Sequence, residues 1–464
     1  MVFSSLTFLF AFLPIALIGW YVLPRKWRIG FLLLISLVFY AWGEPLYVLL
    51  MIGSIVANWT FGLLMDRTEK HKKLWLAASV ILNLSLLFVF KYTGFFWSTV
   101  RGLFPAPLSQ KTVSIRLPIG ISFFTFQIMS YVIDLYRGKA HVQKNPIKFG
   151  AYVTMFPQLI AGPIVRYVDI EEQLDAPERS LTGFCEGVRK FTVGLSKKVL
   201  LANTMAMLFE HLHANLSGIG TVGAWVGVIA FSFQIYFDFS GYSDMACGLG
   251  RMLGFRFVEN FHYPYVAQSI TDHWRRWHIS LGTWFREYVY FPLGGSRRGI
   301  PRQILNTLIV WTLTGLWHGA SWNYVLWGLY YGVLLLVEKL FLGKRIERLP
   351  RVFRHIYTLL TVAIGMELFA FTNLTETVRC LGAMFGIGAP GLLTPDSAAW
   401  CLGFLPMLAV CAFASTPVAA NLMKRAERFR WFAPVRLLGT VALFSLCLAA
   451  LASQSYNPFI YFRF

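Results

Sequence analysis

Charged residues are scarce in this sequence. Only 14% of its 464 residues are Asp, Glu, Lys or Arg, whereas 56% are hydrophobic. Average soluble domains are about a quarter charged, so this chain has too few charged side chains for an ordinary water-exposed surface. The composition therefore excludes a typical soluble protein and predicts an all-α polytopic membrane protein.

Acidic residues are rarer still than basic ones. The chain has 22 Asp and Glu against 42 Lys and Arg, for a formal net charge of +20. A balance of this kind can indicate nucleic-acid binding. Here the basic residues lie in short clusters between apolar runs, as the positive-inside rule produces in cytoplasmic loops. We therefore expect the lipid bilayer as a partner and no nucleic acid.

Cysteine offers no framework for disulfides or metals. The six cysteines are scattered and mostly lie within apolar runs. No CxxC pair occurs, and no cysteine and histidine stand at ligand spacing, so the pattern predicts neither a disulfide set nor a metal site. His211 and His213 have polar neighbours, which favours ordinary loop positions.

Long apolar runs divide the chain into about ten to twelve membrane segments, because a spanning helix needs about 20 apolar residues. One run, at 149–165, contains Pro157, Gly162 and Pro163, which predicts a re-entrant or irregular segment buried in protein. Residues 221–237 and 378–393 are expected to span, whereas 255–302 should form short helices at the cytoplasmic side. We expect one membrane-embedded domain, 1–464, comprising N-terminal spans (1–116), a core (117–345) and C-terminal spans (346–464).

The most unusual polar residue is His318, which ends an apolar run. An ionisable residue at membrane depth is by default a candidate functional residue. A neutral imidazole can serve as a general base near neutral pH, although a helix–helix hydrogen bond is the alternative. The nearby Gly315 and Gly319 permit close approach of a helix or a ligand. Trp317 and Asn323 flank His318 and are candidates for lining the site.

A second candidate, His278, lies in the Arg- and Trp-rich stretch "HWRRWHISLGTW". If this stretch is one helix, His278 shares a face with Trp274 and Arg275. Arg275 and Arg276 could then bind the phosphates of a donor. The alternative is an interfacial helix with snorkelling arginines and belt tryptophans.

Acidic and hydroxyl residues follow the apolar run 221–237. Asp238, Ser240 and Asp244 lie in "FDFSGYSD". These residues could orient a histidine, but Asp and Ser are also good helix N-caps, and both interpretations stay open.

Several stretches occur together in an order typical of one family. The sequence resembles the membrane-bound O-acyltransferase family, in the bacterial branch that acts in alginate O-acetylation. The C-terminal "NPFIYFRF" is also typical of that branch. The stretches are "LPIGISFFTFQIMSYVIDLYRG", "FPQLIAGPIVRY", "QIYFDFSGYSDMACGLGRMLGF", "HWRRWHISLGTWFREYVYFPLGG" and "GLWHGASWNYVLWG".

This resemblance implies a fold, a reaction and a location. The fold would be a ring of tilted helices around a central funnel. His318 would be the catalytic histidine and His278 the second polar position. The reaction would move an acyl group, most simply acetyl, from a cytoplasmic thioester such as acetyl-CoA or an acyl-carrier thioester, with no tightly bound cofactor.

The resemblance also implies an acceptor and partners. The acyl group would reach an exported polysaccharide such as alginate or cellulose, across the bacterial inner membrane. No segment reads as a soluble transferase domain, so a periplasmic acetyltransferase and polysaccharide-export proteins are the expected partners. An alternative is a transporter or channel in which Asp and His relay protons. Transporters often contain inverted repeats with paired broken helices, and none is visible in this sequence.

Overall fold

The computed structural model describes residues 1–103, 113, 115–214, 216–429 and 431–453, and all regular structure within these ranges is helical. Seven of the described helices are long and apolar enough to cross a membrane, and two shorter apolar helices lie at Phe8–Val22 and Ile121–Tyr136. The prediction of an all-α polytopic membrane protein is therefore confirmed. The seven are Tyr47–Arg67, Glu69–Leu103, Thr221–Leu253, Trp322–Arg348, Arg351–Ala370, Pro395–Ala414 and Phe432–Ser453.

The chain forms two compact units, each assembled from two segments. Unit 1 comprises Met1–Phe191 and Tyr242–Glu259, and unit 2 comprises Thr192–Gly241 and Asn260–Phe464. Helix α11 (Thr221–Leu253) therefore contributes its first part to unit 2 and its last part to unit 1.

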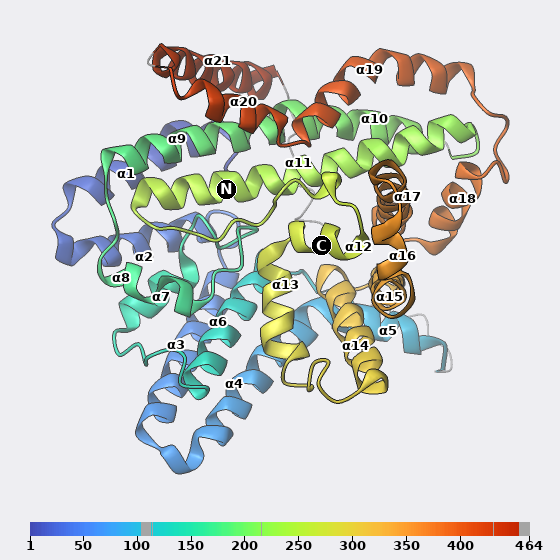
Figure 1. Cartoon of the computed structure of the whole chain (residues 1–464). Helices are drawn as coiled ribbons and strands as arrows, with labels where there is room; N and C mark the ends of the chain where they lie inside the picture. Colours follow the sequence, from blue (N-terminus) through green and yellow to red (C-terminus); the bar gives the residue numbers. More distant parts are fainter. Residues whose placement is uncertain (104–112, 114, 215, 430, 454–464) are drawn as a thin grey trace. The chain divides into compact units, whose positions relative to one another are not determined.

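Unit 1 contains the N-terminal helices, among which α3 and α4 form a hairpin (Figure 1). Helix α7 ends at Thr154, and the irregular segment that follows is buried up to Val165. At Gly162 a Cβ would lie only 2.9 Å from the Gln158 carbonyl oxygen, so this tight turn requires glycine. The predicted break in the apolar run is thus confirmed. The helices are α1 (Leu13–Val22), α2 (Arg25–Ala41), α3 (Tyr47–Arg67), α4 (Lys72–Leu87), α5 (Thr93–Val100), α6 (Ile121–Tyr136), α7 (Pro146–Thr154), α8 (Tyr167–Asp175) and most of α9 (Leu181–Ser196).

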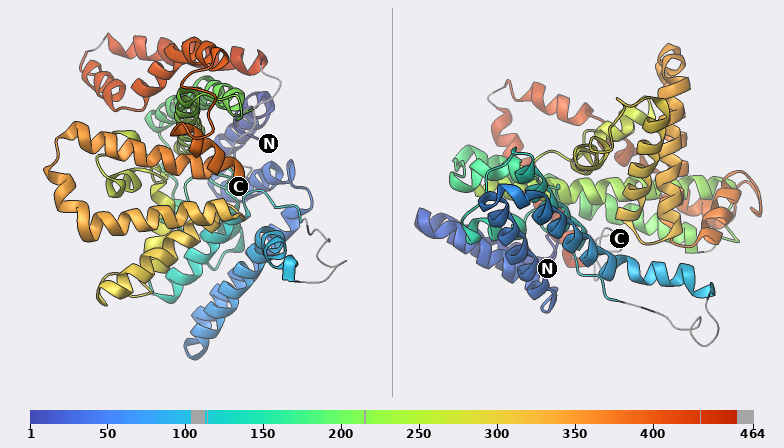
Figure 2. Two further views of the ribbon diagram at one scale, coloured as in Figure 1. Left: turned by 90° about the vertical axis from the view of Figure 1, so that its right-hand side faces the viewer. Right: turned by 90° about the horizontal axis from the view of Figure 1, so that it is seen from below.

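Unit 2 is organised around α15, which packs against both α14 and α17 (Figure 2). The expected short helices within 255–302 are present as α12 and α13. The expected span at 378–393 is wrong, because α18 has 11 residues and ends in a glycine-containing turn. The remaining helices are α10 (Asn203–Ala214), α12 (Ile270–Arg276), α13 (Ile279–Phe285), α14 (Ile300–His318), α15 (Trp322–Val337), α16 (Gly343–Arg348), α17 (Arg351–Ala370), α18 (Leu374–Met384), α19 (Pro395–Ala414), α20 (Val418–Ala426) and α21 (Phe432–Ser453).

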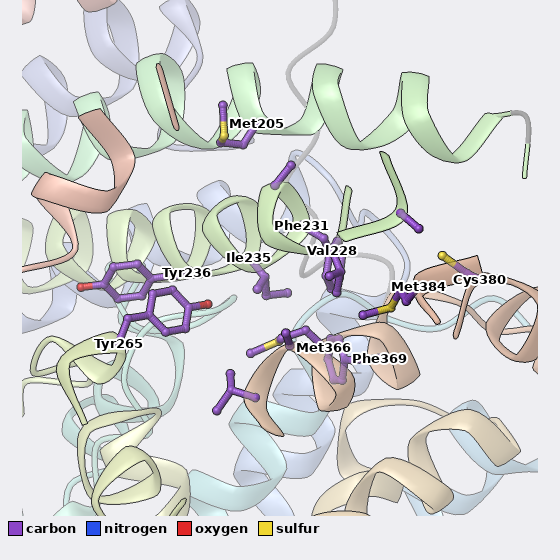
Figure 3. Packing of buried hydrophobic residues seen from close by; sticks show 14 of the residues in the cluster. Met205, Val228, Phe231, Ile235, Tyr236, Tyr265, Met366, Phe369, Cys380 and Met384 are labelled. Carbon is purple, nitrogen blue, oxygen red and sulfur yellow. The ribbon is translucent and has the colours of Figure 1, made fainter. Parts of the chain in front are cut away.

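The core of unit 2 lies where α11 faces α17. Ile235 of α11 points toward Met366 and Phe369 of α17 (Figure 3). Most of residues 104–114 and the C-terminal "NPFIYFRF" lie outside the described residues.

Candidate active site

Two glycines set the position of His318 by bringing α14 and α15 into close contact. A Cβ on Gly315 would lie 2.1 Å from the Tyr324 carbonyl oxygen, and a Cβ on Gly328 would lie 2.2 Å from that of Trp311. Neither helix could approach the other in this way with a larger residue. His318 is the last residue of α14, three residues after Gly315, and only 2% of its surface is exposed.

Aromatic rings surround the His318 imidazole. Its centroid lies 5.1 Å from Trp327 of α15 and 5.3 Å from Phe369 of α17, both edge to face. A small cavity adjoins the imidazole, lined by Ile235, Trp277, His318, Trp327, Met366 and Phe369. His318 therefore lies in an apolar space in which a reacting group would be shielded from water.

His278 does not continue the helix that carries Trp274. Helix α12 ends at Arg276, Trp277 is extended, and His278 is the N-cap of α13, with a left-handed backbone (φ 46°, ψ 52°). The predicted shared face with Trp274 and Arg275 is therefore wrong. His278 is 2% exposed, whereas Arg275 is exposed.

Asn260, which the sequence did not single out, fixes both the backbone and the ring of His278. Its main-chain carbonyl accepts from the Ile279 N–H (3.0 Å), and its Oδ1 accepts from the Ser280 N–H (3.1 Å) and hydroxyl (3.0 Å). Asn260 thus accepts from the first two backbone N–H groups of α13, which receive no hydrogen bond from the His278 side chain. No periodic sequence signal marks Asn260.

The same amide decides which nitrogen of His278 carries the proton. Nδ1 lies 3.2 Å from Asn260 Oδ1, which is the amide oxygen because the Ser280 N–H donates to it. Nδ1 must therefore donate, and Nε2 of the neutral ring is the acceptor. Burial lowers the pKa of His278 to about 3, so the imidazole stays neutral at physiological pH.

The structure brings the two histidines into one cluster. Their ring centroids lie 6.2 Å apart, and Trp317 contacts both, at 5.7 Å from His278 and 5.1 Å from His318. Phe239 of α11 packs edge to face on His278 at 4.7 Å. The two histidines, 40 residues apart in the sequence, therefore belong to one site.

Trp274 joins this cluster indirectly, through Trp327 at 5.5 Å. Its helix, α12, is anchored by a buried carboxylate that the sequence analysis missed. Glu338 Oε1 accepts from the Ile270 N–H (2.7 Å), and Oε2 accepts from the Thr271 N–H (2.9 Å) and hydroxyl (2.7 Å). A carboxylate at a helix N-terminus is favourable because the first N–H groups and the helix dipole point at it.

Asp238 and Asp244 of "FDFSGYSD" do not cap a helix, because both lie inside α11. Asp238 forms a buried ion pair with Lys198 (2.6 Å), and Asp244, in unit 1, lies 3.8 Å from Lys190. These cations explain why α11 continues past 237, where the apolar run was expected to end. Ser240 is buried in the same helix.

Two further predicted residues have structural contacts. Arg276 Nε donates to Asp272 Oδ1 (2.8 Å), so its guanidinium stabilises α12 and is not left for a donor phosphate. Asn323 is buried at the start of α15 and donates to the Thr377 hydroxyl (2.8 Å), which joins α15 to α18.

Comparison with known proteins assigns the family. A model of the membrane-bound O-acyltransferase family matches residues 66–380. The chain is 39% identical, over the whole of both chains, to the probable alginate O-acetylase AlgI of Pseudomonas putida. It is 44% identical to that of Pseudomonas syringae pv. tomato, over 84% of this chain and 76% of the relative.

A relative of lower identity has a name that refers to a different polymer. The peptidoglycan O-acetyltransferase of Helicobacter pylori is 33% identical over 84% of this chain and 81% of its own. The matched family region contains both histidines of the cluster and the helices that position them. The chain therefore belongs to the membrane-bound O-acyltransferase family, in the branch of the alginate O-acetylases, and is a multi-pass membrane O-acyltransferase.

Proposed function

We propose that this protein moves an acetyl group from a cytoplasmic thioester across the bacterial inner membrane, for O-acetylation of an exported polysaccharide such as alginate or cellulose. The observation that carries the proposal is the pair of buried imidazoles with ring centroids 6.2 Å apart, of which His318 lines an apolar cavity. A second argument is the similarity to relatives named as O-acetylases or O-acetyltransferases, over the whole chain in one case and over 84% of it in the other.

His318 is the general base in this proposal. The acceptor hydroxyl gives its proton to the His318 imidazole while its oxygen attacks the thioester carbonyl. The C–O bond forms, the C–S bond breaks, and the departing thiolate takes the proton from the imidazolium. Hydroxyls are poor nucleophiles at neutral pH, and a positioned base contributes about 10²–10⁴-fold in rate.

His278 orients the reacting groups. Its Nε2 can only accept a hydrogen bond, because Nδ1 donates to Asn260. In the proposed step, Nε2 of His278 would accept a hydrogen bond from the acceptor hydroxyl or from the imidazolium of His318. On the donor side, the exposed guanidiniums of Arg275 and Arg286 are suited to phosphate groups of a coenzyme or carrier arm.

The final acceptor is reached through partners. A periplasmic acetyltransferase would receive the acetyl group, and export proteins would deliver the polymer to it. The names of the relatives refer to alginate and to peptidoglycan, which are both polymers.

Reconstitution into sealed vesicles tests the sidedness. Acetyl-CoA supplied only at the face carrying the basic loops should release free thiol when an acceptor alcohol is at the other face. The His318→Ala variant should release none. Thiol release from the opposite face alone would contradict the proposed direction, and solute flux without thiol release would favour the transporter.

A further inference from the structure

Three potential metal ligands that are far apart in the sequence meet within unit 2. They are His213 of α10, Glu367 of α17 and Cys380 of α18, and their ligand atoms all lie within 4.8 Å of one another. From the sequence, His213 was expected in a loop and no metal site was predicted. That interpretation of His213 is wrong, because it lies on a helix and its side chain is 5% exposed.

The distances suit one tetrahedral ion. Cys380 Sγ lies 3.4 Å from His213 Nε2, and Glu367 Oε1 lies 3.8 Å from the same nitrogen. In a tetrahedral zinc site with bonds of about 2.0–2.3 Å, neighbouring ligand atoms are separated by roughly 3.3–3.6 Å. Small side-chain adjustments would bring all three donors onto one metal.

The His213 ring is held with the correct nitrogen toward the cluster. Nδ1 lies 3.1 Å from the carbonyl oxygen of Phe209, which can only accept, so Nδ1 carries the proton and Nε2 holds the lone pair. A ligating histidine commonly donates its other N–H to a backbone carbonyl in this way. Gly227 of α11 leaves the space for the ring, since a Cβ there would lie 2.4 Å from His213 Cε1.

Glu367 gives the strongest indication that a cation belongs here. The residue is fully buried, and its carboxylate lies against the other two candidate ligands, the Cys380 thiol and His213 Nε2. A buried carboxylate is costly unless it is paired with a charge or coordinates a metal. Cys380 is also fully buried and lies beside Met384 in the core (Figure 3).

We propose that His213, Glu367 and Cys380 bind a zinc ion. Thiolate, imidazole and carboxylate donors together favour zinc over magnesium or calcium, which prefer oxygen ligands alone. Water completes the tetrahedron. The ion ties α10, α17 and α18 together and so fixes the end of α17 that carries Phe369, whose ring lies 5.3 Å from His318. The zinc is a structural ion outside the acyl-transfer chemistry.

Metal analysis of the purified full-length protein tests the site. The wild type, purified from zinc-containing medium without chelator, should hold one zinc ion per chain. The Glu367→Gln and Cys380→Ala variants should lose it. Two matched controls should keep it: His211→Asn, two residues before His213 on the same helix, and Cys411→Ala, a buried cysteine outside the cluster.

A spectroscopic measurement covers variants that fail to fold. Cobalt exchanged into the wild type should give visible ligand-field bands and a near-ultraviolet thiolate-to-cobalt band. Both should persist in a chain whose other cysteines are replaced by alanine, which leaves Cys380 as the only thiolate. The replaced positions are Cys185, Cys247, Cys401, Cys411 and Cys447.

Two results would overturn the zinc site. One is a wild type that holds no zinc above background, even after incubation with an equimolar zinc salt. The other is stoichiometric zinc that both ligand variants retain, because the ion would then be bound elsewhere.

Discussion

The imidazole rings of His278 and His318 lie 6.2 Å apart at an interplanar angle of 66°. They come from different elements, the left-handed N-cap of α13 and the last residue of α14. At this separation both rings can contact one small group such as a hydroxyl or an acyl carbonyl. We therefore propose that the two rings form one site, in which His318 moves the proton and His278 orients the reacting atoms.

The first prediction separates the ring of His278 from its backbone. Asparagine tolerates the left-handed region, whereas alanine there costs about 1–2 kcal/mol. His278→Asn should therefore fold as the wild type does but lose at least about tenfold in kcat/KM, since one lost hydrogen bond in the transition state is worth about 1.4 kcal/mol or more. His278→Ala should lose activity and also melt at a lower temperature. Equal activity of His278→Asn and wild type would exclude the orienting role.

The second prediction concerns acid stability. The folded-state pKa of His278 is lowered to about 3, below its value of about 6.5 in an unfolded chain. The unfolded chain therefore binds the extra proton first, and stability from the neutral ring is present above pH 6.5 and lost as pH falls toward 3. In melting experiments from pH 7 to pH 4.5, His278→Asn should lose less stability than the wild type. A parallel decline in the two proteins would contradict the neutral, buried ring.

The third prediction tests the glycine contact beneath His318. Gly315→Ala would place a Cβ against the Tyr324 carbonyl, which is backbone and cannot rotate away. Overpacking of this kind costs about 1–3 kcal/mol, and separating α14 from α15 would displace His318. We expect a lower melting temperature and a fall in kcat larger than any change in KM. Gly403→Ala in α19, where no atom lies within 4 Å of the new Cβ, is the control and should leave both unchanged.

The fourth prediction concerns the buried ion pair between Lys198 and Asp238, whose side chains are 3% and 1% exposed. Asp238→Leu alone removes the carboxylate paired with a buried ammonium and should destabilise the protein by about 3–5 kcal/mol. The double variant with Lys198→Met removes both charges and should recover most of that loss. Denaturation of the three proteins in detergent measures the difference. A double variant as unstable as Asp238→Leu would show that the pair has a role beyond neutralising itself.

Much of the fold could be predicted because a membrane-spanning helix requires a continuous run of apolar residues, which is visible in the sequence. Runs of apolar residues gave most of the long helices, and Pro157 and Gly162 marked the irregular segment after α7. The helix expected to end at 237 continues to Leu253. The sequence did not show this, because the lysines that pair with Asp238 and Asp244 are distant along the chain. The span predicted at 378–393 was wrong because its apolar residues divide between the short helix α18, which buries one face, and the glycine-containing turn after it.

The site was predicted only in part, because several of its residues act through contacts between segments that are distant in the sequence. His318 stood out because an ionisable residue after an apolar run is unusual. Asn260 and Glu338 were invisible, since their roles depend on helix ends that lie far along the chain. The convergence of His213, Glu367 and Cys380 likewise arises from three helices whose packing no local pattern encodes.

The measurement that tests the account most directly is acyl transfer by the His318→Ala variant in the reconstituted protein. The variant should stay folded and keep the zinc content of the wild type, because His318 lies outside both the ion pair and the metal cluster, while loss of its buried ring should lower the melting temperature. The account predicts that thiol release from acetyl-CoA with an acceptor alcohol falls by about 10²–10⁴-fold, the contribution of a general base. A variant that retains transfer within a few-fold of the wild type would contradict the assignment of His318 as the base.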